Sequence, residues 1–294
     1  MIEDILPGFY DELCAAFSDL RRSERLGYSR VLAATEQLVE LIPLPYVEIS
    51  KGARLYRARI SALPQSFRHE RDISYNPHPE LIKRFGRANE PKQSVFYAGT
   101  DPAAALFETI DHAPPGETEG PSVRVTVSVW RLRAPLKMGW VPFAEGVLDA
   151  SIWSDAYRES ARKFEEYCRS NYTDRVASLV KEALYYLSTQ YAQEAKSEDG
   201  YHVTCAYFNS ITRARFNAEY TSVDGLLYPS VKSRYQGDNI AFPPTVVDRR
   251  LEFVDVMEML FDPRGRKITS AKVSDYFGTD GSFLFIRPES DFDS

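Results

Sequence analysis

The 294-residue chain has 44% hydrophobic residues, 27% charged residues and a formal net charge of −6. This composition is typical of a water-soluble globular protein, with enough chain to bury a core in one large domain or two small ones. The acidic balance argues against a nucleic-acid binder held mainly by phosphate contacts, and no apolar run approaches the roughly 20 residues of a membrane span.

Residues 8–42 predict two helices, because apolar residues recur at helical spacing on both sides of a charged linker at 23–29. Pro43 and Pro45 end the second helix. We interpret residues 1–48 as an N-terminal helical hairpin that serves as an accessory cap or an interface, since it contains no catalytic constellation.

Residues 49–250 form the predicted catalytic core. Its first strand is Arg54–Ile60, followed by an irregular surface loop at 61–84, and the alternating valines of 123–129 predict another strand. The pattern turns helical at about 150–200, which we interpret as an insertion into the core.

Within this core, residues 85–108 predict a loop, a strand, a turn and a helix in succession. The loop contains Arg87, and the short apolar strand after it contains Tyr97. Asp101-Pro102 suits an N-cap followed by proline at the first helical position, and the helix that follows contains Glu108. A guanidinium, an aromatic ring and a carboxylate on adjacent elements suit an anionic ligand with an aromatic head.

The end of the core contains two further strand patterns. Asp224–Val231 predicts a strand that runs into a proline kink and Ser230, and residues 237–242 predict a turn and a strand around Asn239. We interpret residues 251–294 as a C-terminal extension packed on the core, with residues 251–261 as either a strand or a helix.

The order of these elements favours an α+β fold, because short strands stand before and after a helical block. The core is predicted to contain short strands in a mixed or antiparallel sheet, with added helices. A dinucleotide fold of the Rossmann kind has no support, since residues 86–89 contain one glycine and no glycine-rich phosphate loop.

Each candidate residue has an alternative interpretation. Arg57, inside an apolar strand, either forms a structural ion pair or points into a polar cleft, and Arg87 is either a solvated charge or a phosphate ligand. Glu108 follows four apolar residues, which favours a role in a site and a polar helix face equally. Tyr97 is more often a core residue than a stacking one, and Ser230 is better interpreted as a hydrogen-bonding serine than as a nucleophile.

Cysteines and histidines indicate neither a disulfide framework nor a metal site. Cys14, Cys168 and Cys205 are far apart and odd in number, which fits a reducing compartment. The chain begins with acidic residues, unlike a signal peptide, so we expect a cytoplasmic protein. His202 and Cys205 lie three residues apart, but two ligands make no site, and we expect no metal.

Taken together, these residues resemble the RES-domain family, the toxins of a widespread class of bacterial toxin–antitoxin pairs. That family is named for an arginine, a glutamate and a serine. The arginine motif matches Leu55-Tyr56-Arg57, the glutamate motif runs from Gly86-Arg87-Ala88-Asn89 through Tyr97 to Glu108, and the serine motif matches residues 224–231 with Asn239 after it. The resemblance covers roughly residues 52–245.

The resemblance implies a fold similar to ADP-ribosyltransferases of the diphtheria-toxin type, with NAD as the substrate. Members cleave the nicotinamide–ribose bond with water or inorganic phosphate as the acceptor. Carried onto this chain, Arg57 and Arg87 would hold phosphates, and Tyr97 would stack on the nicotinamide or its ribose. Ser230 and Asn239 would bind the ligand, and Glu108 would orient the ribose and stabilise the developing positive charge.

Two other functions stay open at this point: transfer of ADP-ribose to a macromolecule, and binding of NAD or a related nucleotide without cleavage. The resemblance also implies an antitoxin protein that occludes the cleft. We expect no direct contact with membrane or nucleic acid, and the oligomeric state is open, a homo-oligomer included.

Overall fold

The computed structural model describes residues 8–23, 26–61, 66–111, 113, 118, 121–141, 154–193, 195, 197–213, 223–230 and 237–286. The helices are α2 (Phe9–Arg21), α3 (Tyr28–Leu41), α4 (Glu70–Ile73), η2 (Pro79–Leu81), α5 (Pro102–Asp111), α7 (Ser154–Asn171), α8 (Asp174–Ala192), η3 (Glu198–Tyr201), α9 (His202–Arg213) and α10 (Pro244–Arg250). The strands are β1 (Tyr46–Ile49), β2 (Arg54–Ile60), β3 (Phe96–Gly99), β4 (Val123–Leu132), β5 (Leu136–Trp140), β6 (Gly225–Pro229), β7 (Asp238–Phe242), β8 (Leu251–Asp262), β9 (Lys267–Phe277) and β10 (Phe283–Ile286).

These strands form one ten-stranded sheet in the order β1-β5-β6-β7-β3-β2-β4-β8-β9-β10. Strands β5 and β6 are parallel, whereas the other neighbours pair antiparallel. The predicted α+β class with a mixed sheet is therefore confirmed.

The sheet opens between β2 and β3. Among the described residues these two strands are in register only where Tyr56 faces Gly99. On its other edge β2 pairs with β4 along its whole length, from Arg54 to Ile60, and β3 pairs with β7 over all four of its residues. Two well-paired parts of the sheet thus diverge from one point, which leaves room between them for side chains and a ligand.

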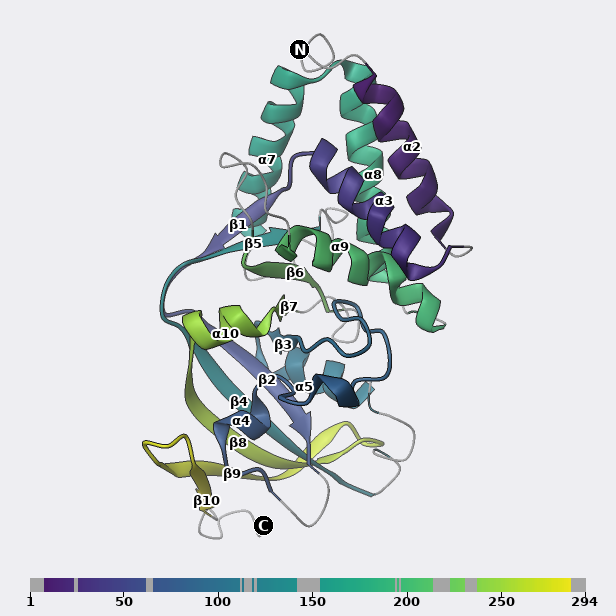
Figure 1. Ribbon diagram of the computed structural model, residues 1–294. Coiled ribbons are helices and arrows are strands. Elements are labelled where there is room, and N and C mark those ends of the chain that lie inside the picture. Colours follow the sequence, from purple (N-terminus) through teal and green to yellow (C-terminus); the bar gives the residue numbers. More distant parts are fainter. Residues whose placement is uncertain are drawn as a thin grey trace.

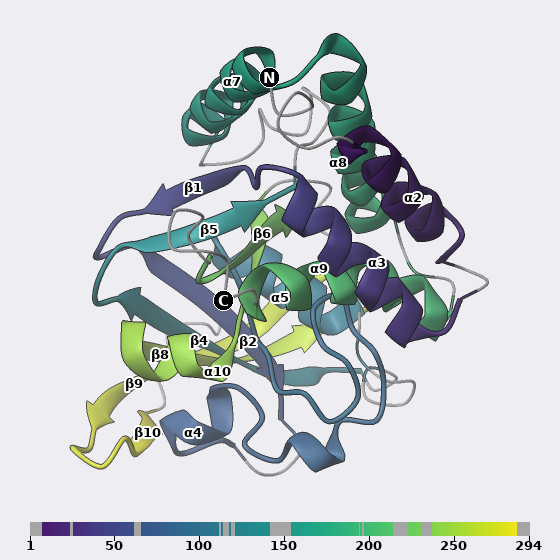
Figure 2. The same cartoon turned by 45° about the horizontal axis from the view of Figure 1, so that its top comes forward.

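Five helices, α2, α3, α7, α8 and α9, gather at the end of the sheet that contains β1, β5 and β6 (Figure 1). Helices α2, α3, α8 and α9 share one hydrophobic cluster with β6, and α7 packs on β5, where the ring of Trp140 lies 4.9 Å from that of Tyr157. In Figure 2, after a turn of 45°, α7 lies above β1 and β5, and α3 and α9 lie to the right of these two strands. None of the helices that the structure describes is long and apolar enough to cross a membrane.

Several predicted elements are present in the structure, and their first and last residues agree with the prediction or nearly agree. The predicted strand Arg54–Ile60 is β2, and the predicted hairpin helices are α2 and α3. The Asp101 carboxylate accepts a hydrogen bond of 2.9 Å from the Ala104 amide, as expected of the N-cap of α5. Residues 251–261, for which both a strand and a helix were open, belong to strand β8.

Other elements have no counterpart in the sequence analysis. The loop at 61–84 includes the short helices α4 and η2, and Ile73 in α4 is buried in the core. Strands β1, β5 and β9 were not predicted either. The boundaries at 48/49 and 250/251 stay a prediction, and residues 1–7 and 287–294 lie outside the described part of the chain.

A close approach between β6 and β7 generates a first testable prediction. A Cβ atom on Gly225 would lie 2.5 Å from the Ala241 carbonyl oxygen and 2.7 Å from the ring of Phe242. We expect Gly225→Ala to lower the free energy of unfolding by about 1–3 kcal/mol, because a backbone atom would have to move. Urea unfolding of the purified protein measures this loss.

Gly139→Ala in the neighbouring strand β5 is the matched control. Its nearest contact would be the Ile211 side chain at 3.0 Å, a group that can shift. An equal loss of stability in both variants would contradict the explanation by backbone contact.

Candidate active site

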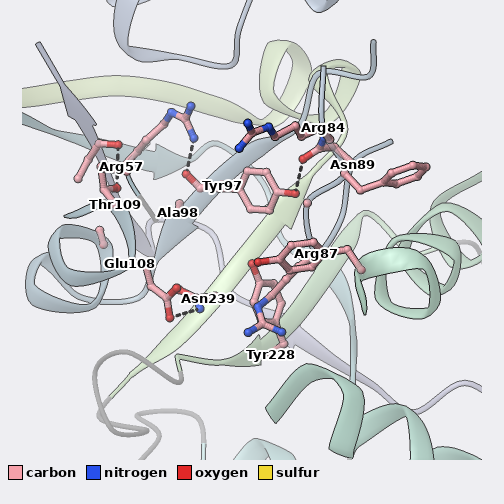
Figure 3. Close-up of a pocket in the computed structure, with 16 residues that line it drawn as sticks. Arg57, Arg84, Arg87, Asn89, Tyr97, Ala98, Glu108, Thr109, Tyr228 and Asn239 are labelled. Atoms are coloured by element: carbon pink, nitrogen blue, oxygen red, sulfur yellow. Dashed lines mark hydrogen bonds between the residues drawn. The ribbon is translucent and has the colours of Figure 1, made fainter. Parts of the chain in front are cut away.

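A pocket of about 540 Å³ lies where β2 and β3 separate, and this volume is within the range of roughly 300–1,000 Å³ for small-molecule sites. Figure 3 shows the side chains that line it. The predicted site residues that line it are Arg57, Arg87, Tyr97, Glu108 and Asn239. Ser230, the sixth predicted residue, contacts one of these five. The structure thus brings all six residues together from β2, β3, α5, β7, the loop before β3 and the end of β6.

Glu108 is held by two neutral donors. The Ser230 hydroxyl donates a hydrogen bond of 2.7 Å and the Asn239 side-chain amide one of 2.9 Å, both to Oε1 of Glu108. The proline kink before Ser230 is a common way to expose a side chain. In the structure the Ser230 side chain is instead fully buried. The backbone explains its position, since the Ser230 amide donates to the Gly237 carbonyl and extends the pairing of β6 with β7.

Arg57 crosses the opening in the sheet. Its guanidinium donates to the Tyr97 carbonyl at 2.6 Å and to the Ser74 carbonyl at 3.1 Å, and it lies 5.1 Å from the centre of the Phe96 ring. Burial, with a further contribution from the charge of Arg59, lowers the pKa of Arg57 to about 9. In the described part of the chain, its hydrogen-bond partners are carbonyl oxygens and no carboxylate, so a bound anion would offset the cost of burying its charge.

Arg87 lies on the opposite side of the pocket and is 8% exposed. Its guanidinium donates to the carbonyl oxygens of Gln193 at 2.8 Å and Gln190 at 3.5 Å, at the C-terminal end of α8. A helix C-terminus favours a cation through its dipole. The charge of Arg87 is therefore held in place by carbonyl groups, which leaves it able to attract a phosphate.

Tyr97 has two roles in the structure. Its ring lines the pocket, as stacking on a ligand would require, while its hydroxyl donates to Oδ1 of Asn89 at 2.8 Å and accepts from the Ala88 amide at 2.9 Å. Burial raises the pKa of Tyr97 well above its ordinary value, so the hydroxyl keeps its proton. The loop that contains Arg87 is thus anchored to β3 through this hydroxyl, a role that the strand pattern did not indicate.

The sequence analysis missed several residues of the pocket wall, among them Arg84, Phe85, Tyr201 and Tyr228. Arg84 lies three residues before Arg87 in the same loop. This proximity in sequence was the one signal that could have indicated Arg84 as a pocket residue. Tyr201 comes from η3, far along the chain, and only folding brings it 5.9 Å from the guanidinium of Arg87. Tyr228 was assigned to a motif without a role, and it lines the pocket with its ring 5.2 Å from that of Tyr191 in α8.

No group of three or more histidine, cysteine, aspartate or glutamate side chains in the described residues is arranged to hold a metal ion. His202 lies 3.5 Å from Asp199, and Cys205 lies 3.4 Å from the Tyr28 hydroxyl, so the polar contacts of the pair noted in the sequence go to two different groups. The absence of a metal stays a prediction.

The family model of the RES domain matches residues 54–262. The chain belongs to the RES-domain family. The resemblance deduced from the motifs is thereby confirmed, and all six predicted site residues lie inside the matched segment of the RES domain. Helices α2 and α3 precede the RES segment. A comparison with curated proteins found no match.

The hydrogen bond between Asn239 and Glu108 gives a second prediction. Asn239→Asp would place a second carboxylate within hydrogen-bond distance of Glu108. Like charges raise the pKa of such a pair by about 1–3 units, so we expect a loss of about 1–4 kcal/mol in unfolding free energy at pH 8. Because the folded state then binds more protons than the unfolded state, the loss should shrink as the pH falls towards 5.

Urea unfolding at pH 8 and pH 5 measures this effect. Asn239→Ala is the control, since it removes the hydrogen bond without adding a charge and should lose about the same stability at both pH values. A loss for Asn239→Asp that does not change with pH would mean that its new carboxylate is not near Glu108.

Proposed function

We propose that this RES-domain protein consumes NAD by breaking the bond between nicotinamide and ribose, with water or inorganic phosphate as the acceptor. One observation carries the proposal: a carboxylate oriented by two donors shares a pocket with two arginines whose hydrogen bonds go to carbonyl groups. Membership of the family supports it, because RES domains resemble NAD-dependent ADP-ribosyltransferases.

Arg57 and Arg87 suit the diphosphate of NAD. Guanidinium groups bind phosphate oxygens through paired, charge-assisted hydrogen bonds. The two groups extend from opposite walls of the pocket, from β2 and from the loop before β3 (Figure 3). The rings of Tyr97, Tyr201 and Tyr228 line the same space and offer flat apolar surface to the bases.

Glu108 suits the reacting sugar. When the C1′–N bond breaks, its electron pair leaves with neutral nicotinamide, and positive charge develops on the ribose. A carboxylate already in position stabilises this charge without reorganising. Ser230 and Asn239 hold the carboxylate in one orientation. The acceptor oxygen then forms a bond to C1′ and loses its proton to solvent.

Depletion of NAD inside a cell would stop growth, so we propose that the protein acts as a toxin. An antitoxin that occludes the cleft is part of this proposal, and it rests on the family. Two alternative functions are binding of NAD without cleavage and transfer of ADP-ribose to a macromolecule. The following experiments give a different result for each of them.

Glu108→Gln tests the proposed chemistry. We expect NAD cleavage to fall at least 100-fold, because the charge opposite the developing cation is removed, while the affinity for ADP-ribose changes less than about threefold. Nicotinamide release, followed by chromatography with and without inorganic phosphate, gives the rate and identifies the acceptor. Glu48→Gln, on the exposed side of β1, is the matched control.

Full activity of Glu108→Gln would refute the assignment of this residue. Tight binding of NAD by the wild-type protein without release of nicotinamide would favour the binding module, and label transferred from NAD to protein in a lysate would favour the ADP-ribosyltransferase. Induced expression in a bacterial host tests the toxin: growth should stop with the wild-type chain and continue with Glu108→Gln.

The lowered pKa of Arg57 predicts a pH dependence of binding. Since the protonated guanidinium holds the phosphate, the affinity for ADP-ribose should be constant below the pKa of about 9 and fall above it. By pH 10 about a tenth of the guanidinium remains charged, which corresponds to roughly tenfold weaker binding. Titration calorimetry from pH 7.5 to 10 measures the profile.

Arg57→Gln should bind more weakly at every pH and show no such decline. Tyr97 does not interfere, because burial holds the pKa of its hydroxyl well above the ordinary value. A flat profile for the wild-type protein would contradict the lowered pKa of Arg57, and equal affinity of the wild-type protein and Arg57→Gln at pH 7.5 would contradict a role of the Arg57 charge in binding.

A further inference from the structure

The arginine loop, residues 82–93, contains Arg84 and Arg87 and closes on itself. At its base the Lys92 amide donates to the Ile82 carbonyl at 2.9 Å, and at its tip the Gly86 amide donates to the Asn89 carbonyl at 2.9 Å. These bonds fix the shape of the loop but not its position relative to the sheet. Contacts outside the loop must therefore position it.

Besides the carbonyl groups of α8 that hold Arg87, the loop has two supports: the Tyr97 hydroxyl on the inner side and a partly buried polar cluster on the outer side. The Gln93 side-chain amide donates to Oδ1 of Asn209 at 2.6 Å, and the Asn209 amide donates to the Tyr28 hydroxyl at 2.8 Å. The Glu90 backbone amide donates to Oε1 of Gln93 at 2.9 Å. We call Tyr28, Gln93 and Asn209 the helix clamp, because it joins the loop to α3 and α9.

Packing follows the same path as these hydrogen bonds. The ring of Phe85, which lines the pocket, lies 4.8 Å from the ring of Tyr28 and 4.7 Å from that of His202. At the far end of α9, Arg213 forms an ion pair of 2.7 Å with Glu90. The loop therefore contacts α3 at Tyr28 and α9 at both of its ends.

The central residue of the helix clamp, Asn209, is buried. Asn209 is 1% exposed, so loss of a partner would leave a buried amide unsatisfied, which is costly. Burial also raises the pKa of the Tyr28 hydroxyl well above its ordinary value, so this group stays neutral. A hydrogen-bonded cluster around a buried amide tolerates few geometries and holds its members in one arrangement.

We infer that helices α3 and α9 are the rigid support of the arginine loop, and that Tyr28, Gln93 and Asn209 are positioning residues for the grip of Arg87 on the diphosphate. This inference rests on the proposed function. Tyr28 lies before residues 54–262, so the substrate site uses a helix from outside the matched RES segment. The N-terminal hairpin then contributes to binding and is more than a cap.

Two variants of the full-length protein test the inference. Asn209→Ala removes the centre of the clamp, and Tyr28→Phe removes one hydroxyl but keeps the ring on Phe85. We expect the affinity for ADP-ribose to fall about tenfold for Asn209→Ala and about threefold for Tyr28→Phe. The kcat for NAD should stay within about threefold, because Glu108 and its donors lie on other elements.

Tyr186→Phe is the matched control. It removes a hydroxyl that bonds the Leu20 carbonyl at 3.3 Å, between α8 and α2 of the same helical layer, with no bond to the arginine loop. Hydrogen–deuterium exchange supplies a readout without any ligand. The amides of residues 84–93 should exchange faster in Asn209→Ala and unchanged in Tyr186→Phe.

Unchanged exchange of the loop in Asn209→Ala would overturn the inference, and so would faster exchange with unchanged affinity. An equal loss of affinity in Tyr186→Phe would also overturn it, since that would indicate general destabilisation. If the wild-type protein binds no ADP-ribose, the proposed function fails, and the exchange data still decide whether the clamp holds the loop.

Discussion

The site depends on the interruption of pairing between β2 and β3. Beyond Tyr56 and Gly99 the two strands separate, and the Tyr97 carbonyl accepts its hydrogen bond from the Arg57 side chain. Backbone carbonyls inside a protein require partners, so a guanidinium here takes the part that a backbone amide has in a paired strand. At this place the sheet is open, the pocket lies between the two strands, and the hydrogen bond to Tyr97 holds the Arg57 cation at the edge of β3.

The partners of the arginines explain how the pocket keeps its charge. An arginine paired with a carboxylate would present little net charge to a ligand, whereas the hydrogen bonds of Arg57 and Arg87 go to carbonyl oxygens. Carbonyl dipoles orient a guanidinium without neutralising it. Such a site is costly when empty and favours a ligand with negative charge. This preference is consistent with the dinucleotide that we propose as the substrate.

Local signals made much of this predictable. The residue pattern of β2 and the N-cap at Asp101 are enough to place Arg57 and Glu108 on their elements. The assignment of Arg57, Glu108 and Ser230 to one site came from the order of the motifs and their resemblance to the RES domain. Long-range contacts could not be predicted in this way. Strand β9 is largely exposed and is defined by its pairing with β8. Tyr201 reaches the pocket only because α8 and α9 pack on the sheet. The second role of Tyr97 depends on its hydroxyl, which a strand pattern does not register.

The helical layer and the pocket share one hydrophobic core. Leu13 of α2 and Leu38 of α3 belong to the same buried cluster as Val95 before β3 and Tyr228 of β6. Within that cluster the Tyr228 ring, a wall of the pocket, lies 5.2 Å from the ring of Tyr191 in α8. Protein interiors are closely packed and transmit displacement. We therefore expect a shift of the N-terminal helices to move the wall of the pocket, so the added helices belong to the physical description of the site.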